Sequence, residues 1–125
     1  MNNIIKYSNL KVLDEQEASS LKSIVEKEYD KIVKLLPEPS DLIVDVKVAH
    51  KDKNKRYMIS LRLETASKIY TTKSKDTNET ADYDLVKAAH KICTHLYNEV
   101  SHSVGKDKGN TKKKGIKELF KIFKN

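Results

Sequence analysis

The sequence predicts an α+β domain of order β-α-β-β-β-α, in which a four-stranded, mainly antiparallel sheet carries two helices on one face. Two segments repeat apolar residues at three and four positions, as amphipathic helices do. Between them, three successive segments have the composition or alternation of strands. Three strands in a row exclude parallel crossovers between the helices, so both helices are expected to pack on the same side of the sheet.

The first strand and the first helix follow from the first 36 residues. Residues 4–12 mix apolar and polar side chains and predict a short strand. Asp14, with Glu17 three positions later, is a capping-box signature for a helix start. The repeating apolar positions of this helix are Leu21, Ile24, Val25, Ile32, Leu35 and Leu36. Pro37 and Pro39 cannot continue it, so we expect the helix to end near Leu36.

Three strands are predicted next. Residues 42–49 and 57–64 alternate apolar and polar side chains on either side of a polar turn at 51–55, which predicts a hairpin. Residues 69–75 are rich in Thr and Tyr and predict a third antiparallel strand, and residues 76–81 are expected to form a loop. By alternation, the face of the sheet away from the helices is expected to carry Asp45, Lys47, Ser60, Arg62 and Glu64.

The second long helix is predicted over residues 82–104. Its expected core stripe consists of Val86, Ala89, Cys93, Leu96 and Val100. Asp82 and Asp84 stand in its first turn, and Gly105 is the expected stop. The chain then divides into a domain of residues 1–105 and a Lys-rich tail of residues 106–125. In this tail a linker precedes a short amphipathic helix that contains Ile116, Leu119, Phe120 and Phe123.

Positive charge is concentrated in that tail. The chain carries +7, and the eight Lys of residues 106–125, set against Asp107 and Glu118, contribute +6 of it. Residues 1–105 are therefore almost neutral, and they can attract a polyanion only where charge is locally sorted.

Helical-wheel positions indicate such sorting. On the second helix, Lys87, Lys91, His95, Asn98 and His102 share one outer side, with no acidic residue of that helix among them. On the first helix, Lys27, Lys31 and Lys34 share a flank, while Glu26 and Asp30 lie apart from it. The alternative interpretation is an ordinary solvated face, because Lys is common on the outer face of soluble helices.

Catalytic and metal chemistry are not expected. Cys93 lies on the core stripe, where a thiol usually serves as a small apolar filler. His95 and His102 are about 10 Å apart along the helix, too far to share a zinc ion. All three glycines lie at residue 105 or later and follow no predicted strand, so no phosphate-binding loop is expected. We expect no enzyme activity, no cofactor and no metal. A lone Cys and the lack of a signal peptide or membrane-spanning stretch indicate the cytoplasm.

Several motifs resemble one known family. They are Leu21-Lys22-Ser-Ile-Val25 and Tyr29-Asp-Lys31-Ile32 in the first helix, and Asp84-Leu85 followed by Ala88-Ala89 and Leu96 in the second. Over residues 4–104 the chain resembles the ribosome hibernation promoting factors, also called ribosome-associated inhibitors or sigma-54 modulation proteins. Val86 stands where that family usually has Tyr, and His95 and Asn98 stand where it has Lys and Arg.

The resemblance implies a fold like a double-stranded-RNA-binding domain. It also implies binding to the small ribosomal subunit between head and body, which blocks the mRNA and tRNA sites and silences translation under stress or in stationary phase. The expected partner is rRNA, not DNA or a membrane, and about twenty residues after Gly105 are too few for a dimerisation domain. The expected RNA-binding residues are Lys22, Lys27, Lys31, Lys34, Lys87, Lys91, His95, Asn98, His102, Lys106, Lys108, Lys112, Lys113 and Lys114. The alternative function is a protein-interaction adaptor that docks through the C-terminal amphipathic segment.

Overall fold

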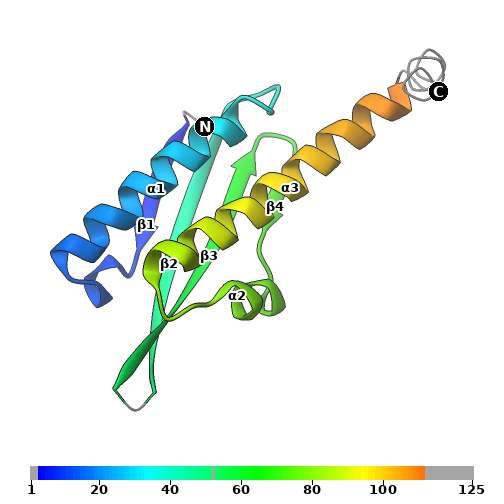
Figure 1. Cartoon of the computed structure of the whole chain (residues 1–125). Helices are drawn as coiled ribbons and strands as arrows, with labels where there is room; N and C mark the ends of the chain where they lie inside the picture. Colours follow the sequence, from blue (N-terminus) through cyan, green and yellow to red (C-terminus); the bar gives the residue numbers. More distant parts are fainter. Residues whose placement is uncertain (1–2, 52, 112–125) are drawn as a thin grey trace.

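The computed structural model describes residues 3–51 and 53–111 and confirms the predicted α+β fold class (Figure 1). Its elements are β1 (Ile4–Ser8), a 3-10 turn (Leu10–Val12), α1 (Glu15–Val33), β2 (Ser40–Lys51), β3 (Asn54–Thr65), β4 (Ile69–Thr71), α2 (Ser74–Thr80) and α3 (Leu85–Thr111). None of the helices in these described ranges is long and apolar enough to cross a membrane.

The four strands form one sheet in the order β1-β2-β3-β4. β1 runs parallel to β2, and the other two pairings are antiparallel, so the sheet is mainly antiparallel as predicted. The predicted hairpin is confirmed by a β2–β3 register that pairs Leu42 with Leu63 and Val46 with Ile59. The helices α1 and α3 lie side by side on one face of the sheet (Figure 1). The apolar side chains of β2 and β3 on that face are buried beneath them.

The start of α1 is fixed as the sequence predicted. The Glu17 amide donates to Asp14 Oδ1 at 2.7 Å, and the Asp14 amide donates to Glu17 Oε1 at 3.0 Å, which completes the capping box. The other Glu17 oxygen accepts from the Tyr57 hydroxyl on β3, and this hydrogen bond is the main reason why the pKa of Tyr57 is raised to about 12. The cap therefore also ties the helix to the sheet. The helix ends at Val33, three residues before the predicted end at Leu36.

The edge strands are shorter than predicted. β1 ends at Ser8, because Asn9 adopts a left-handed conformation with φ 63° and turns the chain into the 3-10 segment. β4 ends at Thr71, and the predicted loop at 76–81 is wrong, because residues 74–80 form α2. This helix has no apolar stripe to reveal it in the sequence. It follows the outer edge of β3, until a backbone bridge between Tyr57 and Asp82 rejoins the sheet.

Three predictions about the second long helix are wrong. It begins at Leu85 and not at residue 82, so Asp82 and Asp84 precede its first turn. Val86 was predicted to lie in the core stripe but is 44% exposed. It stands at the capped start of the helix, where its amide donates to the Asp84 side chain. The buried face of the helix is formed by Leu85, Ala88, Ala89, Ile92, Cys93, Leu96 and Val100. Gly105 does not end the helix, because α3 continues to Thr111 and leaves the sheet behind (Figure 1). Residues 106–111 are thus helical and do not form a linker. The predicted amphipathic helix around Ile116 to Phe123, and with it the adaptor surface, lies outside the described residues.

Candidate nucleic-acid interface

The outer side of α3 carries the residues predicted to face RNA. Lys87, Lys91, Asn98 and His102 are all exposed. The first and last of them are 15 positions apart, which is about 22 Å of helix. His95 belongs to the same side but is only partly exposed, because it faces α2. The helix therefore presents a row of hydrogen-bond donors that is long enough to contact several phosphates. The net charge of that row depends on the acidic side chains next to it.

An acidic residue neutralises one member of this row. Lys91 Nζ lies 2.7 Å from Asp82 Oδ2. This hydrogen bond, with a second from the Asp84 amide and the nearby charge of Lys87, holds the pKa of Asp82 below its usual value. The prediction that acids are absent from the row is wrong, because Asp82 contacts Lys91 and, on α3 itself, Glu99 contacts His95. Asp82 precedes the helix and is positioned by its bridge to Tyr57, which a helical wheel cannot represent.

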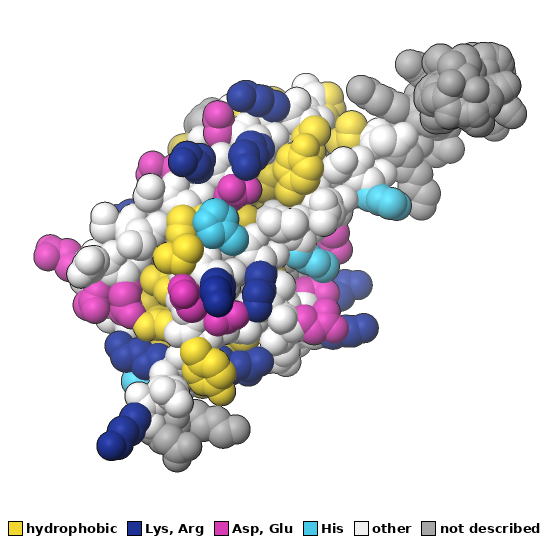
Figure 2. All heavy atoms as spheres, viewed as in Figure 1, with side chains coloured by type: hydrophobic (Ala, Val, Ile, Leu, Met, Phe, Trp, Pro, Cys, Tyr) yellow, Lys and Arg dark blue, Asp and Glu magenta, His cyan; other side chains and the backbone are white. Residues whose placement is uncertain are grey.

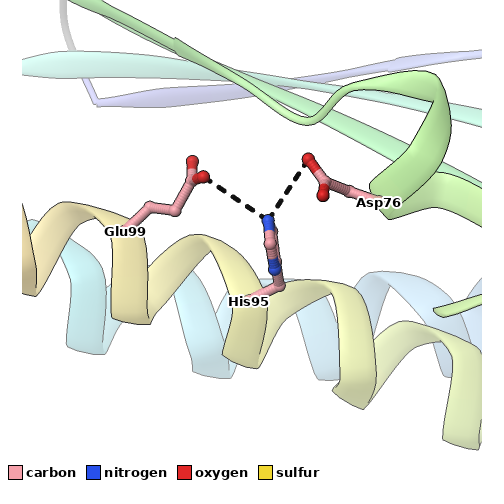
Figure 3. Close-up of side chains that lie close together, drawn as sticks. All are labelled: Asp76, His95 and Glu99. Atoms are coloured by element: carbon pink, nitrogen blue, oxygen red, sulfur yellow. Dashed lines mark ion pairs between the residues drawn. The ribbon is translucent and has the colours of Figure 1, made fainter. Parts of the chain in front are cut away.

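His95 is surrounded by carboxylates. Its Nε2 lies 3.4 Å from Asp76 Oδ2 on α2 and 3.5 Å from Glu99 Oε2 one turn further along α3 (Figure 3). A histidine between two acids is a poor phosphate ligand, because its charge when protonated is already compensated. The structure thus sets His95 apart from its neighbours in the predicted RNA-binding row.

Two lysines at the C-terminal end of α1, one in the helix and one at its C-cap, form ion pairs. Lys31 pairs with Glu28 at 3.4 Å, and Glu28 also lies 3.9 Å from His90 Nδ1 on α3. Lys34 pairs with Asp30 at 3.6 Å, so the predicted separation of Asp30 from the lysine flank is wrong. Residues at i and i+4 are neighbours on a helix, and the long Lys side chain bridges the angle between them.

The remaining two lysines of α1 carry no ion pair within the described residues. Lys27 is exposed on the predicted flank. Lys22 Nζ lies 5.7 Å from the centre of the Tyr7 ring on β1, a cation–π contact at the edge of the sheet away from α3. Lys22 is therefore not brought together with the α3 row.

The face that carries the two long helices is consequently a mixture of charges. Figure 2 shows Lys and Arg side chains interspersed with Asp and Glu over this face, without one continuous basic patch. Apart from Lys22, the predicted residues that are exposed on the two neighbouring helices α1 and α3 are Lys27, Lys31, Lys87, Lys91, Asn98 and His102. Lys106 and Lys108 extend α3, although their side chains are not described. Lys112, Lys113 and Lys114 lie outside the described residues.

The structure adds a shallow hollow beside α3 that the sequence did not predict. It is lined by Lys68, Tyr70, His95, Asn98, Glu99, His102 and Ser103. Lys68 follows β3, and its Nζ lies 5.2 Å from the Tyr70 ring centre and donates to Ser103 Oγ on α3. Only the packing of β4 beside α3 brings Lys68 to this position, so no periodicity in the sequence could have indicated it.

Cys93 behaves as the sequence predicted. It is buried in the core, and desolvation, assisted by the charge of Glu28, raises the pKa of its thiol to about 12. Because the thiolate is the reactive form, Cys93 is unsuited to act as a nucleophile at neutral pH.

Comparisons with known proteins give a likeness of fold. No protein-family model matches the sequence, and no curated protein is similar to it at a significant level. Among solved structures, the crystal structure of the N-terminal domain of Protein Y from Thermus thermophilus aligns with a TM-score of 0.54 and 17% identity. The alignment covers 82% of this chain and 98% of that domain. At this identity the likeness establishes a shared fold.

Proposed function

We propose that this protein is a ribosome hibernation factor that binds rRNA of the small subunit and silences translation. The observation that carries the proposal is the exposed row of Lys87, Lys91, Asn98 and His102 on α3, flanked by Lys27 and Lys31 of α1. Folded RNA is recognised mainly by its shape, phosphates and 2′-hydroxyl groups, and a row of lysine and amide donors on a rigid helix suits those contacts.

Two further findings support this function. The motifs in α1 and α3 resemble the hibernation family. That resemblance implies a particular fold. The observed element order and the likeness to the Protein Y domain agree with it. In this proposal the small-subunit channel between head and body receives the helix face, so that the domain blocks the mRNA and tRNA positions. The role is one of binding, consistent with the buried, protonated thiol of Cys93.

The ion pairs of the helix face give the proposal a specific form. Lys91 and Lys31 already have carboxylate partners, whereas Lys27 and Lys87 have none within the described residues. Exposed ion pairs are worth only about 0–1 kcal/mol, so a phosphate can replace a carboxylate partner at little cost. We propose that Lys27 and Lys87 make the first contacts and that Lys31 and Lys91 exchange partners on binding.

Co-sedimentation with purified small subunits tests the proposal. Wild-type protein should move with the subunit through a sucrose gradient at low salt and should inhibit translation in a cell-free system. Lys87→Glu should weaken both effects. Lys47→Glu is the matched control, because Lys47 is exposed on β2 and its side chain points to the opposite, helix-free face of the sheet. Wild-type protein that stays at the top of the gradient, or equal losses in the two variants, would contradict the proposal.

A further inference from the structure

Three metal-ligating side chains converge between α2 and α3. Asp76 comes from the first turn of α2, and His95 and Glu99 stand one turn apart on α3. Their ligand atoms all lie within 4.8 Å of one another, and both carboxylates point toward the same histidine nitrogen (Figure 3). The cluster therefore joins two elements through one imidazole and two carboxylates, a set of donor types that zinc accepts in proteins.

The distances fit a shared cation better than direct hydrogen bonds. His95 Nε2 lies 3.4 Å from Asp76 Oδ2 and 3.5 Å from Glu99 Oε2. Charge-assisted hydrogen bonds are shorter, at about 2.7–2.9 Å. Ligands at about 2.0–2.2 Å from a tetrahedral zinc ion are, in contrast, separated by about 3.3–3.5 Å. The two nitrogen–oxygen separations match this second geometry.

The histidine nitrogen supplies an independent indication. His95 Nε2 is buried from solvent, and although Asp76 and Glu99 lie at ion-pair distance, it makes no hydrogen bond of normal geometry to any described residue. A buried polar atom without a well-formed hydrogen bond is rare and requires an explanation. A cation between the three side chains would satisfy this nitrogen and both carboxylates together.

The surroundings orient the ligands and leave one side open. The Lys73 amide donates to Asp76 Oδ2 at 3.0 Å, which fixes the carboxylate and is the main reason why the pKa of Asp76 is lowered. Such outer contacts are typical of metal sites. The side chains of His95 and Glu99 are 31% and 43% exposed, and both line the hollow beside α3. Water can therefore reach a fourth coordination position.

We propose that Asp76, His95 and Glu99 form a site for a divalent transition-metal cation, with Zn²⁺ as the best fit. Each side chain supplies one ligand, and water supplies the fourth. The bound cation links α2, which covers the edge of β3, to α3. The site depends on no assumption about RNA. It assigns His95 a role different from that of its exposed neighbours on α3.

Competition with a chromophoric chelator, using full-length metal-free protein and Zn²⁺ alone, tests the site. We expect one saturable Zn²⁺ per chain, and a loss of affinity of about tenfold or more in His95→Gln and in Asp76→Asn. Co²⁺ should give the visible absorption of a tetrahedral complex in the wild type but not in these variants. Zn²⁺ should also raise the melting temperature of the wild-type protein but not that of these variants.

Two matched controls make the result decisive. His102→Gln removes an exposed histidine of the same helix, and Glu79→Gln removes an exposed carboxylate of α2. Both should bind Zn²⁺ as the wild type does. If either variant at position 76 or 95 fails to fold, Glu99→Gln replaces it, because this surface position tolerates an amide. Absence of saturable binding in the wild type, or equal weakening in His102→Gln and His95→Gln, would overturn the proposal.

Discussion

Replacing Asp82 by Asn should tighten RNA binding if the outer side of α3 contacts phosphate. The change removes the carboxylate that holds Lys91 at 2.7 Å. Asn keeps the Oδ1 atom that accepts from the Asp84 amide at 2.9 Å, so the start of α3 should be preserved. The Lys91 side chain, which is 48% exposed, then becomes free to meet a phosphate.

The size of the effect follows from the ion pair. In the wild type Lys91 must leave Asp82 before it meets a phosphate, so removing Asp82 saves the free energy of an exposed ion pair, about 0–1 kcal/mol, and should tighten binding by up to about fivefold. Each neutralised phosphate changes log K by about 0.7–0.9 per tenfold change in salt, and Lys91 neutralises one in both proteins, so the salt slope should change little. Fluorescence anisotropy with an rRNA fragment, measured over a salt series, gives both values.

Glu64→Gln is the control with the same change in net charge. It releases Arg62, which Glu64 holds at 2.7 Å on the helix-free face of the sheet. If α3 faces the RNA, Glu64→Gln should change affinity much less than Asp82→Asn. Equal gains would mean that net charge alone drives binding, and weaker binding by Asp82→Asn would show that Lys91 does not face phosphate. Either result refutes the reasoning.

Four further predictions concern the fold. Tyr29→Phe should lower the free energy of unfolding by about 1–2 kcal/mol in urea, because the Tyr29 hydroxyl donates to the buried Ser40 carbonyl at 2.9 Å; Tyr83→Phe, at an exposed position, should change nothing. Cys93 should react with Ellman's reagent only when the protein unfolds, since burial raises its thiol pKa to about 12; rapid reaction of native protein would contradict the packing of α3. Asp76 and Asp82 have folded pKa values below 3.8, so their contribution to stability is present above that pH and is lost as the pH falls through the lower folded values; the urea midpoint should drop on acidification, and less steeply in Asp82→Asn. Gly105→Ala should stabilise α3 by about 0.5–1 kcal/mol and increase helical circular dichroism, because space is free around the added methyl group and the glycine does not have a positive φ; a loss of stability would mean that the helix stops there.

Much of the architecture could be predicted because it depends on local chemistry. The capping box at Asp14 and Glu17 and the prolines after Leu36 bracket the first helix, and alternation fixes the buried faces of β2 and β3. The features that were missed have no such signal. α2 is polar all round and carries no apolar period, so it was missed. β4 was predicted, but its end was misplaced because a strand of three residues has too short an alternation to show where it stops. Val86 was misplaced because a wheel drawn from one reference residue cannot locate the sheet.

The candidate site separates the two sources of information most clearly. The sequence by itself determined which donors share the outer side of each long helix, because helical periodicity is a property of the local chain. Only the tertiary structure decided which of those donors remain uncompensated. Asp82 reaches Lys91 through a strand bridge, and Asp76 reaches His95 through a helix that covers the edge of β3. Ion pairing depends on distances of a few ångströms between segments remote in sequence, and packing alone sets those distances.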